Sequence, residues 1–425
     1  MKRILLAITA LIALILIFNK LIYNNRLPPN YQALRVDVNR NKAVINSISM
    51  MDSNFSDLHV FDRILNDNRI LMLGEMMHDD GETFRAKSRL IRYLHEKLDY
   101  HIVLYEAGQY DMWVMNREMD RPTMQLPKQS LAGLGLFNFW WRNNETDPLI
   151  NYYQKSKLSG KPITLGGFDI QFSGRLLADK RAKLLADFCL KNKIDLKDYP
   201  LLKKELNNLG YLTLARYADR KLDSKAKRQL LSEIGKLSHA FQVSGGDEEQ
   251  RVYNQYLADI KTNYEKSWSY APGSMASMQL RDSLMAKNLQ YQIDSLYAGK
   301  KVIVWCANIH TFSTAYNKEY LPLGAYIKKK YGNQAYMLDF SSYGQKNDAG
   351  QIVGKPGKLA IENLFHQTGV PYFFLDLRGL PDTAQLRRPF VSVINQGIEE
   401  ERKWTDYIDG IFYIDLNKRP TYLER

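Results

Sequence analysis

Residues 69–78 of the chain read Arg-Ile-Leu-Met-Leu-Gly-Glu-Met-Met-His, and this stretch decides the fold. The apolar run Ile70–Leu73 is short and closes on a glycine, which is typical of a buried strand in a parallel sheet. Glu75 and His78 follow directly after that glycine. A buried strand that ends on a carboxylate and a histidine indicates an α/β sheet with polar chemistry at one edge.

Three further apolar runs of the same kind occur later in the chain. They are residues 101–105 before Glu106, residues 163–168 before Asp169, and residues 301–306 before Asn308 and His310. In an open parallel sheet the carboxyl ends of the strands form one edge, and ligands bind in the crevice there. We therefore expect these side chains to meet in a single site and the protein to be an enzyme.

The segments around these runs predict helices and further strands. A helix is expected from about Glu82 to Leu98, and a strand at Gln334–Phe340. Residues from about 175 to 298 have an almost wholly helical pattern, which predicts a helical subdomain inserted between core strands. Two last strands, at Tyr372–Leu377 and Ile411–Leu416, are expected at the sheet edge. The predicted fold class is α/β, with a mostly parallel central sheet flanked by helices.

The amino terminus has the pattern of a membrane anchor. The basic pair Lys2 and Arg3 precedes a largely apolar stretch, Ile4–Tyr23, with no small-residue cleavage site and no lipoprotein cysteine after it. This length approaches the roughly 20 residues that span a bilayer. We expect residues 1–30 to be an uncleaved signal anchor and linker that holds one domain, residues 31–425, on the extracytoplasmic side, periplasmic or cell-surface. The alternative is a protein secreted after its signal peptide is cleaved.

Composition excludes several classes of protein. The net charge of +13 comes from Lys and Arg spread among acidic residues, without a recognised nucleic-acid module, so we expect a solvated basic surface and no nucleic-acid partner. Cys189 and Cys306 lie in apolar patterns and predict neither a disulfide framework nor a zinc site. No G-x-S-x-G, H-E-x-x-H or Walker sequence occurs, which argues against a serine-nucleophile hydrolase, a zincin and a P-loop enzyme. The sequence leaves the oligomeric state open.

Glu75 and His78 are the first candidate catalytic pair. A carboxylate three residues before a histidine can orient its imidazole, and histidine is the usual general base for activating water. On its own, His78 is more often a structural residue at the start of a helix. Glu106, Asp169 and His310 at equivalent strand ends favour catalysis instead. The residues predict attack by water assisted by His and Glu, with or without a metal.

The order of these motifs resembles the erythromycin esterase family, from about Ile70 to the C-terminus. The matching elements are Leu73-Gly74-Glu75-x-x-His78, Lys87, Tyr105-Glu106-Ala107-Gly108, Trp141-Arg142-Asn143-Asn144-Glu145, Gly167-Phe168-Asp169-Ile170-Gln171, the helix from Arg281-Asp282 to Asn288, and the run Lys301–His310. The resemblance implies a hydrolase that cleaves a small-molecule ester or lactone without a metal or other cofactor.

The resemblance also implies roles for individual residues. His78 would be the base that activates water, with Glu75 and Glu106 holding the imidazole and the water, and His310 would take the role of the family's second-strand histidine. These four are the expected catalytic residues. The expected substrate-binding residues are Lys87, Asp169, Arg281 and Asn308.

The chain departs from the family pattern at specific positions. Ala307 stands where the family has the first histidine of His-Asn-x-His, and Met76, Met77 and Asp79 replace a small residue, a threonine and a glycine. We therefore expect a substrate other than a clinical macrolide. Two alternatives stay open: a metal-dependent hydrolase that uses the same Glu/His cluster, and a non-catalytic surface binding protein that retains the cleft.

Overall fold

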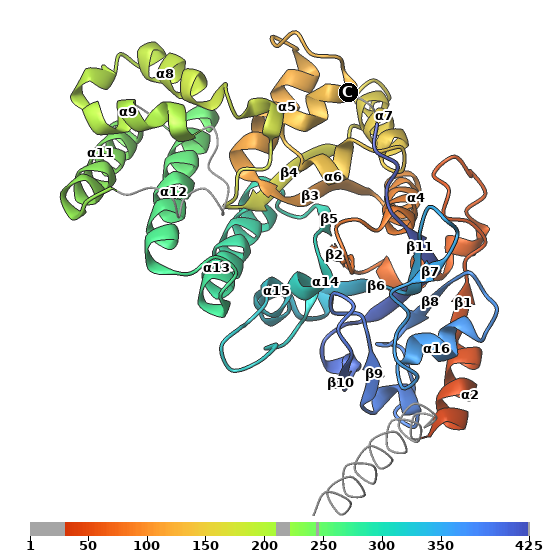
Figure 1. Ribbon diagram of the computed structural model, residues 1–425. Coiled ribbons are helices and arrows are strands. Elements are labelled where there is room, and N and C mark those ends of the chain that lie inside the picture. The colour runs from red at the N-terminus through yellow and green to blue at the C-terminus, as the bar shows by residue number, and fades with distance from the viewer. Residues whose placement is uncertain (1–29, 210–221, 244–245, 424–425) are drawn as a thin grey trace, which may run out of the picture.

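The computed structural model describes residues 30–209, 222–243 and 246–423. These residues form a nine-stranded sheet of order β1-β8-β11-β6-β2-β5-β3-β4, with β7 paired to β6 (Figure 1). The strands are β1 (Lys42–Val44), β2 (Ile70–Leu73), β3 (Tyr100–Gly108), β4 (Thr164–Asp169), β5 (Lys301–Trp305), β6 (Ala335–Lys346), β7 (Ile352–Val353), β8 (Tyr372–Asp376) and β11 (Gly410–Lys418). Every pair from β11 to β4 is parallel, and β1, β7 and β8 pair antiparallel. The predicted mostly parallel sheet is confirmed.

The apolar strand runs are explained by helices on both faces of the sheet. Leu71 and Leu73 point into a core shared with α4 (Gly81–Lys97), whereas Ile70 and Met72 point into the opposite core. On the first face lie α4, α5 (Gln109–Asp120) and α7 (Asp147–Ser156), and on the second α13 (Met275–Tyr291) and α15 (Leu323–Tyr331). A strand buried on both faces has no polar alternation, so its sequence reads as a continuous apolar run.

Only helices fill the described part of the chain between β4 and β5. They are α8 (Arg181–Lys191), α9 (Pro200–Leu209), α11 (Ser224–Val243), α12 (Glu248–Ser269) and α13, with short helical turns between them. In Figure 1, α8, α9, α11 and α12 stand together beside the β4 end of the sheet, and α13 returns to cover the sheet. This arrangement places α12 and α13 next to the carboxyl end of β4.

The sheet edge differs from the prediction. The strand predicted at Ile411–Leu416 is β11, which lies inside the sheet between β6 and β8. The strand predicted at Tyr372–Leu377 is β8, whose outer side pairs with β1. Both edge predictions are wrong, because the lead-in segment supplies β1 as the outer strand. A strand's apolar pattern reports burial of its faces and carries no information about which neighbour pairs with it.

Two glycines let the strand ends approach the segments beside them. A Cβ atom on Gly74 would lie 2.1 Å from Oδ1 of Asn308, and one on Gly167 would lie 2.3 Å from the carbonyl oxygen of Ala107. No side chain fits at such distances, so these positions require glycine.

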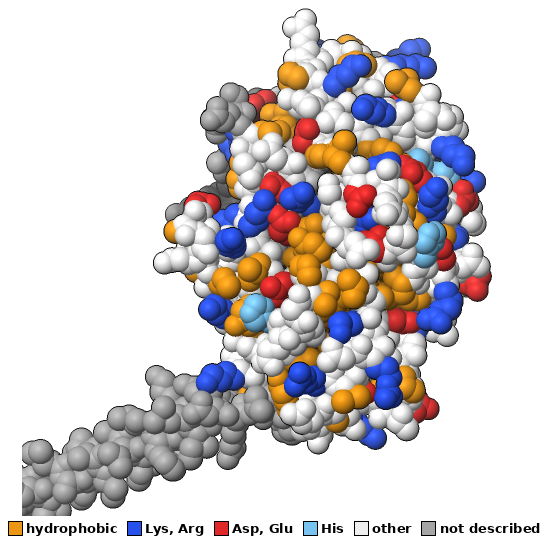
Figure 2. Space-filling view, turned by 90° about the vertical axis from the view of Figure 1, so that its right-hand side faces the viewer, with side chains coloured by type: hydrophobic (Ala, Val, Ile, Leu, Met, Phe, Trp, Pro, Cys, Tyr) orange, Lys and Arg blue, Asp and Glu red, His pale blue; other side chains and the backbone are white. Residues whose placement is uncertain are grey.

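The surface and the termini add little to the site. On the face in Figure 2, Lys and Arg side chains lie scattered among acidic and apolar ones. Cys189 and Cys306 are free and buried. The predicted signal anchor Ile4–Tyr23 lies outside the described residues, and none of the helices within 30–209, 222–243 and 246–423 is long and apolar enough to cross a membrane.

Candidate active site

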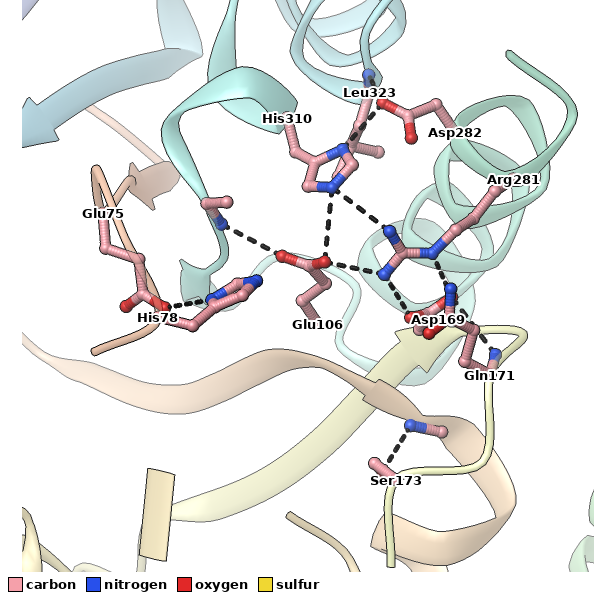
Figure 3. Close-up of polar contacts among 12 residues, drawn as sticks. Glu75, His78, Glu106, Asp169, Gln171, Ser173, Arg281, Asp282, His310 and Leu323 are labelled. Atoms are coloured by element: carbon pink, nitrogen blue, oxygen red, sulfur yellow. Dashed lines mark hydrogen bonds and ion pairs between the residues drawn. The ribbon is translucent and has the colours of Figure 1, made fainter. Parts of the chain in front are cut away.

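Side chains from separate elements meet at the carboxyl edge of the sheet (Figure 3). They are Glu75 and His78 after β2, Glu106 in β3, Asp169 at the end of β4, Arg281 and Asp282 on α13, and His310 on the short helix α14 (Asn308–Thr311). Glu106 was expected after its strand, but β3 extends past it to Gly108, with an irregular register between Tyr105 and Gly108.

Glu75 is a buried carboxylate with a full set of donors. Its Oε1 accepts from Nδ1 of His78 at 2.7 Å and from Nε1 of Trp140 at 2.9 Å. Its Oε2 accepts from Nζ of Lys87 at 2.9 Å and from Nε1 of Trp305 at 2.7 Å. Burial raises the pKa of Glu75, but Lys87 and His78 more than offset this, so that the pKa lies below its usual value. The side chain is therefore a fixed anion.

His78 is held at one nitrogen and open at the other. Because Nδ1–H donates to Glu75, Nε2 carries the lone pair, and no described residue bonds to it. The ring stacks on Phe139, with centroids 4.8 Å apart, and 43% of the side chain is exposed. Burial lowers the pKa of His78, but the carboxylates of Glu75 and Glu106 outweigh it and raise the pKa above the usual value of 6.5. An oriented imidazole with a free, accessible nitrogen can accept a proton from water.

Glu106 is the second fixed anion. Its Oε1 accepts from Nη2 of Arg281 at 2.6 Å and lies 3.2 Å from Nε2 of His310, while its Oε2 accepts from the backbone N–H of Ala307 at 3.0 Å. Burial raises the pKa of Glu106, but His310 and Arg281 hold it well below its usual range. Glu106 also contributes to the raised pKa of His78.

His310 is a cation rather than a second base. It is 3% exposed, its Nδ1 donates to Oδ2 of Asp282 at 2.9 Å, and its Nε2 faces Glu106. Burial lowers the pKa of His310, but Asp282 and Glu106 raise it to about 10. At neutral pH both ring nitrogens are protonated, so His78 is left as the histidine of this cluster that can take up a proton.

Three of the residues predicted to bind substrate are fully buried: Lys87, Asp169 and Asn308. Lys87 is fully buried, pairs with Glu75, and has its ammonium 4.5 Å from the ring centre of Trp305. Asp169 is fully buried and pairs with Arg281 through two hydrogen bonds of 3.1 and 2.5 Å. The ammonium of Lys87 holds Glu75 in place, and the carboxylate of Asp169 holds Arg281 in place. The predictions that Lys87 and Asp169 contact the substrate are therefore corrected.

Asn308 is also placed differently from its prediction. Its side-chain amide donates to the carbonyls of Phe340 and Ile394, each at 2.8 Å, and its Oδ1 accepts from the N–H of Phe340. It is fully buried and joins α14 to the neighbouring segments. Among the four predicted substrate-binding residues, Arg281 is the one with an accessible side chain, 15% exposed.

The sequence prediction missed three residues of the site, Trp140, Trp305 and Asp282. Trp140 and Trp305 donate to Glu75, and Asp282 accepts from His310, from the hydroxyl of Tyr320 at 2.8 Å, and from the N–H of Leu323 at 2.9 Å. The sequence contains one indication of the role of Trp305: it is the last residue of an apolar strand run and brings an N–H donor to the strand end. Asp282 follows Arg281 directly in the middle of α13, so both polar side chains come from the same turn of that helix.

The metal alternative gains no support from the arrangement. No group of three or more His, Cys, Asp and Glu side chains in the described residues has the geometry to hold a metal ion. The carboxylates of Glu75 and Glu106 are instead turned toward Lys87, Arg281 and N–H donors.

Comparison with known proteins identifies the family and relatives of this chain. The profile of the family described as "Erythromycin esterase" matches residues 95–415, a range that contains Glu106, Asp169, Arg281 and His310 and begins after His78. The chain is 24% identical over 395 residues to "Putative hydrolase YbfO" of Bacillus subtilis, covering 84% of this chain and 86% of that protein. It is 21% identical over 402 residues to "Erythromycin esterase type II" of Escherichia coli, covering 86% and 93%.

Two solved structures share the fold. A protein described as a succinoglycan biosynthesis protein superimposes with a TM-score of 0.71 at 17% identity, covering 92% of this chain and 98% of that one. A mutant of the erythromycin esterase EreC in its open conformation superimposes with a TM-score of 0.68 at 14% identity, covering 90% and 99%.

Proposed function

Because the chain belongs to the erythromycin esterase family, and is on that ground a hydrolase acting on ester bonds, we propose that it cleaves an ester or lactone by attack of a water molecule, with His78 as the general base. The observation that carries the proposal is the hydrogen bonding and the exposure of the His78 imidazole. Its Nδ1 is fixed by a buried carboxylate, while its Nε2 has no partner among the described residues and 43% of the side chain is exposed. His310 cannot take this role, because both of its nitrogens are protonated at neutral pH.

The proposed reaction has two steps. Nε2 of His78 accepts a proton from water as the water oxygen bonds to the carbonyl carbon of the ester. The bond from that carbon to the alcohol oxygen then breaks, and the alcohol leaves with the proton returned from His78. Glu75 and Glu106 stabilise the imidazolium that forms between the steps.

In this mechanism, the guanidinium of Arg281 stabilises the negative charge that develops on the carbonyl oxygen of the substrate. Nε of Arg281 is bonded to Asp169 and its Nη2 to Asp169 and Glu106, which fixes the guanidinium, and its Nη1 lies 3.4 Å from Nε2 of His310. A cation held in place before the reaction stabilises a developing oxyanion without reorganisation. In this role Arg281 contacts substrate, whereas Lys87 and Asp169 position other groups.

The substrate differs from a clinical macrolide in this proposal. Ala307 contributes a backbone N–H to Glu106 and has only a methyl group where the family has an imidazole. Met77, which is 43% exposed, adds an apolar side chain directly before His78 in the chain. Both replacements change the side chains beside the site, and neither alters His78, the proton acceptor of this proposal.

The test is a panel of lactones, aryl esters and acyl esters assayed with the wild type and with His78→Ala. Loss of general-base assistance should lower the rate by about 10²–10⁴-fold. His59→Ala is the matched control, since His59 lies on the surface outside the site, where its ion pair is with Asp62. Equal turnover by the wild type and His78→Ala would end the general-base assignment.

The same assay separates the two alternatives. Activity that a chelator removes and a divalent ion restores would favour the metal-dependent hydrolase. If the wild type turns over nothing in the panel but binds esters with an affinity that His78→Ala does not change, the protein is a binding protein that retains the cleft.

The location is the remaining part of the proposal: the enzyme is attached to the membrane through Ile4–Tyr23 and works on the extracytoplasmic side. The support is the charged start and the long apolar stretch of the sequence. Fractionation followed by N-terminal sequencing tests it. A soluble extracytoplasmic chain that starts between Tyr23 and Tyr31 would show cleavage and release.

A further inference from the structure

A large cavity lies beside β4, apart from the candidate active site. It has a volume of about 1020 Å³ and is bounded by the outer edge of β4 and by α5, α11, α12 and α13. Among the described residues β4 is the last strand of the sheet, so helices and not a further strand cover its outer edge. Figure 1 shows α12 and α13 beside β4. None of the residues of the candidate active site is in the lining.

Two of these helices turn polar faces toward the cavity. On α5 the lining includes Gln109, Trp113 and Asn116, which are spaced four and three residues apart and therefore share one face. On α12 it includes Gln255 and Ala258, again three residues apart. A helix face that packs against the rest of a protein is normally apolar. Polar faces around an open space instead favour a cavity that holds water or a ligand.

Side-chain amides cover the outer edge of β4. The amide of Asn116 donates to the carbonyl oxygen of Leu165, and that of Gln292, directly after α13, donates to the carbonyl oxygen of Gly167 at 2.8 Å. Oδ1 of Asn116 and Oε1 of Gln292 accept no hydrogen bond from the described residues. Both amides are thus held in place by the strand and keep one acceptor each for a molecule in the cavity.

The absence of a side chain at Gly166 leaves room beside these groups. A Cβ atom on Gly166 would lie 3.1 Å from Oε1 of Gln292 and 3.7 Å from the hydroxyl oxygen of Tyr297. The hydroxyl of Tyr297 forms no hydrogen bond within the described part of the chain. An acceptor and a hydroxyl donor therefore lie close together at the strand edge, next to a residue that has no side chain.

Further amides in the lining supply both donors and acceptors. Oδ1 of Asn254 accepts from the hydroxyl of Ser238 at 2.8 Å, and the NH₂ group of Asn254 has no acceptor among the described residues. Nε2 of Gln255 donates to Asp259 at 2.9 Å, which leaves its oxygen open. The side chain of Gln109 is not bonded to any described residue. The cavity thus offers several neutral groups of each polarity.

The charged side chains of the lining offer no buried free charge. Arg117 is bonded to Glu249 at 2.8 Å, and Lys157 to Asp120 at 2.5 Å. The other basic residues of the lining are exposed to solvent: Arg251 and Lys287. An ion loses its hydration when it enters a cavity and needs a counter-charge there. The lining therefore suits a neutral polar ligand better than an ion.

Aromatic rings complete the lining. Trp113 is partly exposed, and its N–H donates to Glu248 at 3.2 Å, which fixes the indole. Tyr291 is 45% exposed, and Tyr297 is partly exposed. The face of an aromatic ring is negative and attracts polarised C–H groups, such as those on one side of a sugar ring.

We propose that the cavity beside β4 binds a neutral oligosaccharide. A sugar hydroxyl both donates and accepts a hydrogen bond, and a carboxamide does the same, so the amides of the lining match a chain of hydroxyls. The C–H face of a sugar ring stacks on Trp113 or Tyr291. The cavity reaches the upper end of the roughly 300–1,000 Å³ that ligand pockets span, which leaves room for several sugar residues. This site is separate from the proposed hydrolysis and does not depend on it.

Calorimetric titration tests the binding. Maltotetraose, cellotetraose, laminaritetraose and acetylated chitotetraose are titrated into the wild type, Trp113→Ala, Ala258→Trp and Ala276→Trp. We expect at least one of them to bind the wild type, and Trp113→Ala to bind it about 10-fold more weakly or worse, because the stacking surface is lost. Ala258→Trp places a large side chain in the cavity and should abolish binding. Ala276→Trp is the matched control, since Ala276 is exposed on α13 outside the lining, and it should bind like the wild type.

Two more variants separate folding and the active site from the binding. Asn254→Leu keeps the size of the side chain but removes the amide, and should weaken binding about 3- to 10-fold. It is the independent variant in case Trp113→Ala does not fold. His78→Ala should bind the oligosaccharide like the wild type, because His78 is not in the lining.

Decanoate and inorganic phosphate are the comparison ligands, and both should bind more weakly than the oligosaccharide. The proposal is overturned if none of the four oligosaccharides binds, or if Trp113→Ala, Ala258→Trp and Asn254→Leu all bind like the wild type. Loss of binding in His78→Ala would place the sugar in the candidate active site and would also overturn it. Tighter binding of decanoate would make the cavity an apolar site, and tighter binding of phosphate would make it an anion site.

Discussion

Replacing Lys87 with methionine removes the ammonium that pairs with Glu75 inside the protein. Both side chains are fully buried and their charged atoms are 2.9 Å apart. Methionine has nearly the same length as lysine, so the change deletes a charge with little change in volume. The carboxylate of Glu75 is then left in the interior with only neutral donors and His78 around it.

The expected loss follows from the cost of an uncompensated buried charge. Breaking a buried ion pair by removing one partner costs about 3–5 kcal/mol. With an unfolding entropy of about 2.1 cal/mol/K per residue, the 425 residues of the chain give about 0.9 kcal/mol/K. Lys87→Met should therefore lower the melting temperature by about 3–6 °C.

Calorimetry of the wild type, Lys87→Met and Lys97→Met measures this change. Lys97 is the control on the same helix, exposed in the last turn of α4, and its replacement should leave the melting temperature within a degree. The double variant Lys87→Met with Glu75→Gln should lose less than the sum of the two single variants, since it removes both charges. A melting temperature that Lys87→Met leaves unchanged would refute the conclusion that Lys87 neutralises Glu75, and would return Lys87 to a role in substrate binding.

Three further predictions concern protonation and donors. The acid limb of the plot of kcat/KM against pH should have its midpoint above pH 6.5. The reason is that the neighbouring carboxylates raise the pKa of His78, and only the neutral ring can act as a base. A midpoint at or below pH 6.5 would contradict this. The raised pKa of His310 means that its protonated form stabilises the fold fully below pH 6.5 and that this contribution is lost as pH rises through about 10. The melting temperature should fall across that window, and in Asp282→Asn, measured in parallel, the fall should come at lower pH. Trp305→Phe removes an N–H donor from a buried carboxylate and should cost about 1.5–3 kcal/mol in stability by calorimetry, whereas Trp113→Phe, whose N–H reaches only a surface glutamate, should cost little.

The strands of the core were predictable because burial on both faces leaves a mark in the local sequence. The runs ending near Glu75, Glu106, Asp169 and His310 are β2, β3, β4 and the β5–α14 junction, each within a few residues of the predicted bounds. Parallel pairing then brings their carboxyl ends to one edge whatever the rest of the chain does. For this reason the convergence of the site could be expected before any contact was known.

The order of the strands was not predictable in the same way. Both β8 and β11 are apolar runs, yet β11 pairs parallel with β6 and antiparallel with β8, whereas β8 pairs antiparallel with both β11 and β1. Which strands pair depends on how the connecting segments pack, and those contacts join residues hundreds of positions apart.

The amino-acid sequence by itself determined the kind of fold, the apolar runs, and which polar residues stand at the strand ends. Only the tertiary structure decided what each polar residue does, because charge state and accessibility depend on neighbours from other elements. His78 and His310 are alike in sequence, but Asp282 and Glu106 make His310 a buried cation, whereas Glu75 fixes His78 and leaves its second nitrogen open. Lys87 and Lys97 lie on the same helix, and only the packing of that helix against the sheet buries Lys87 beside Glu75 and leaves Lys97 exposed to solvent.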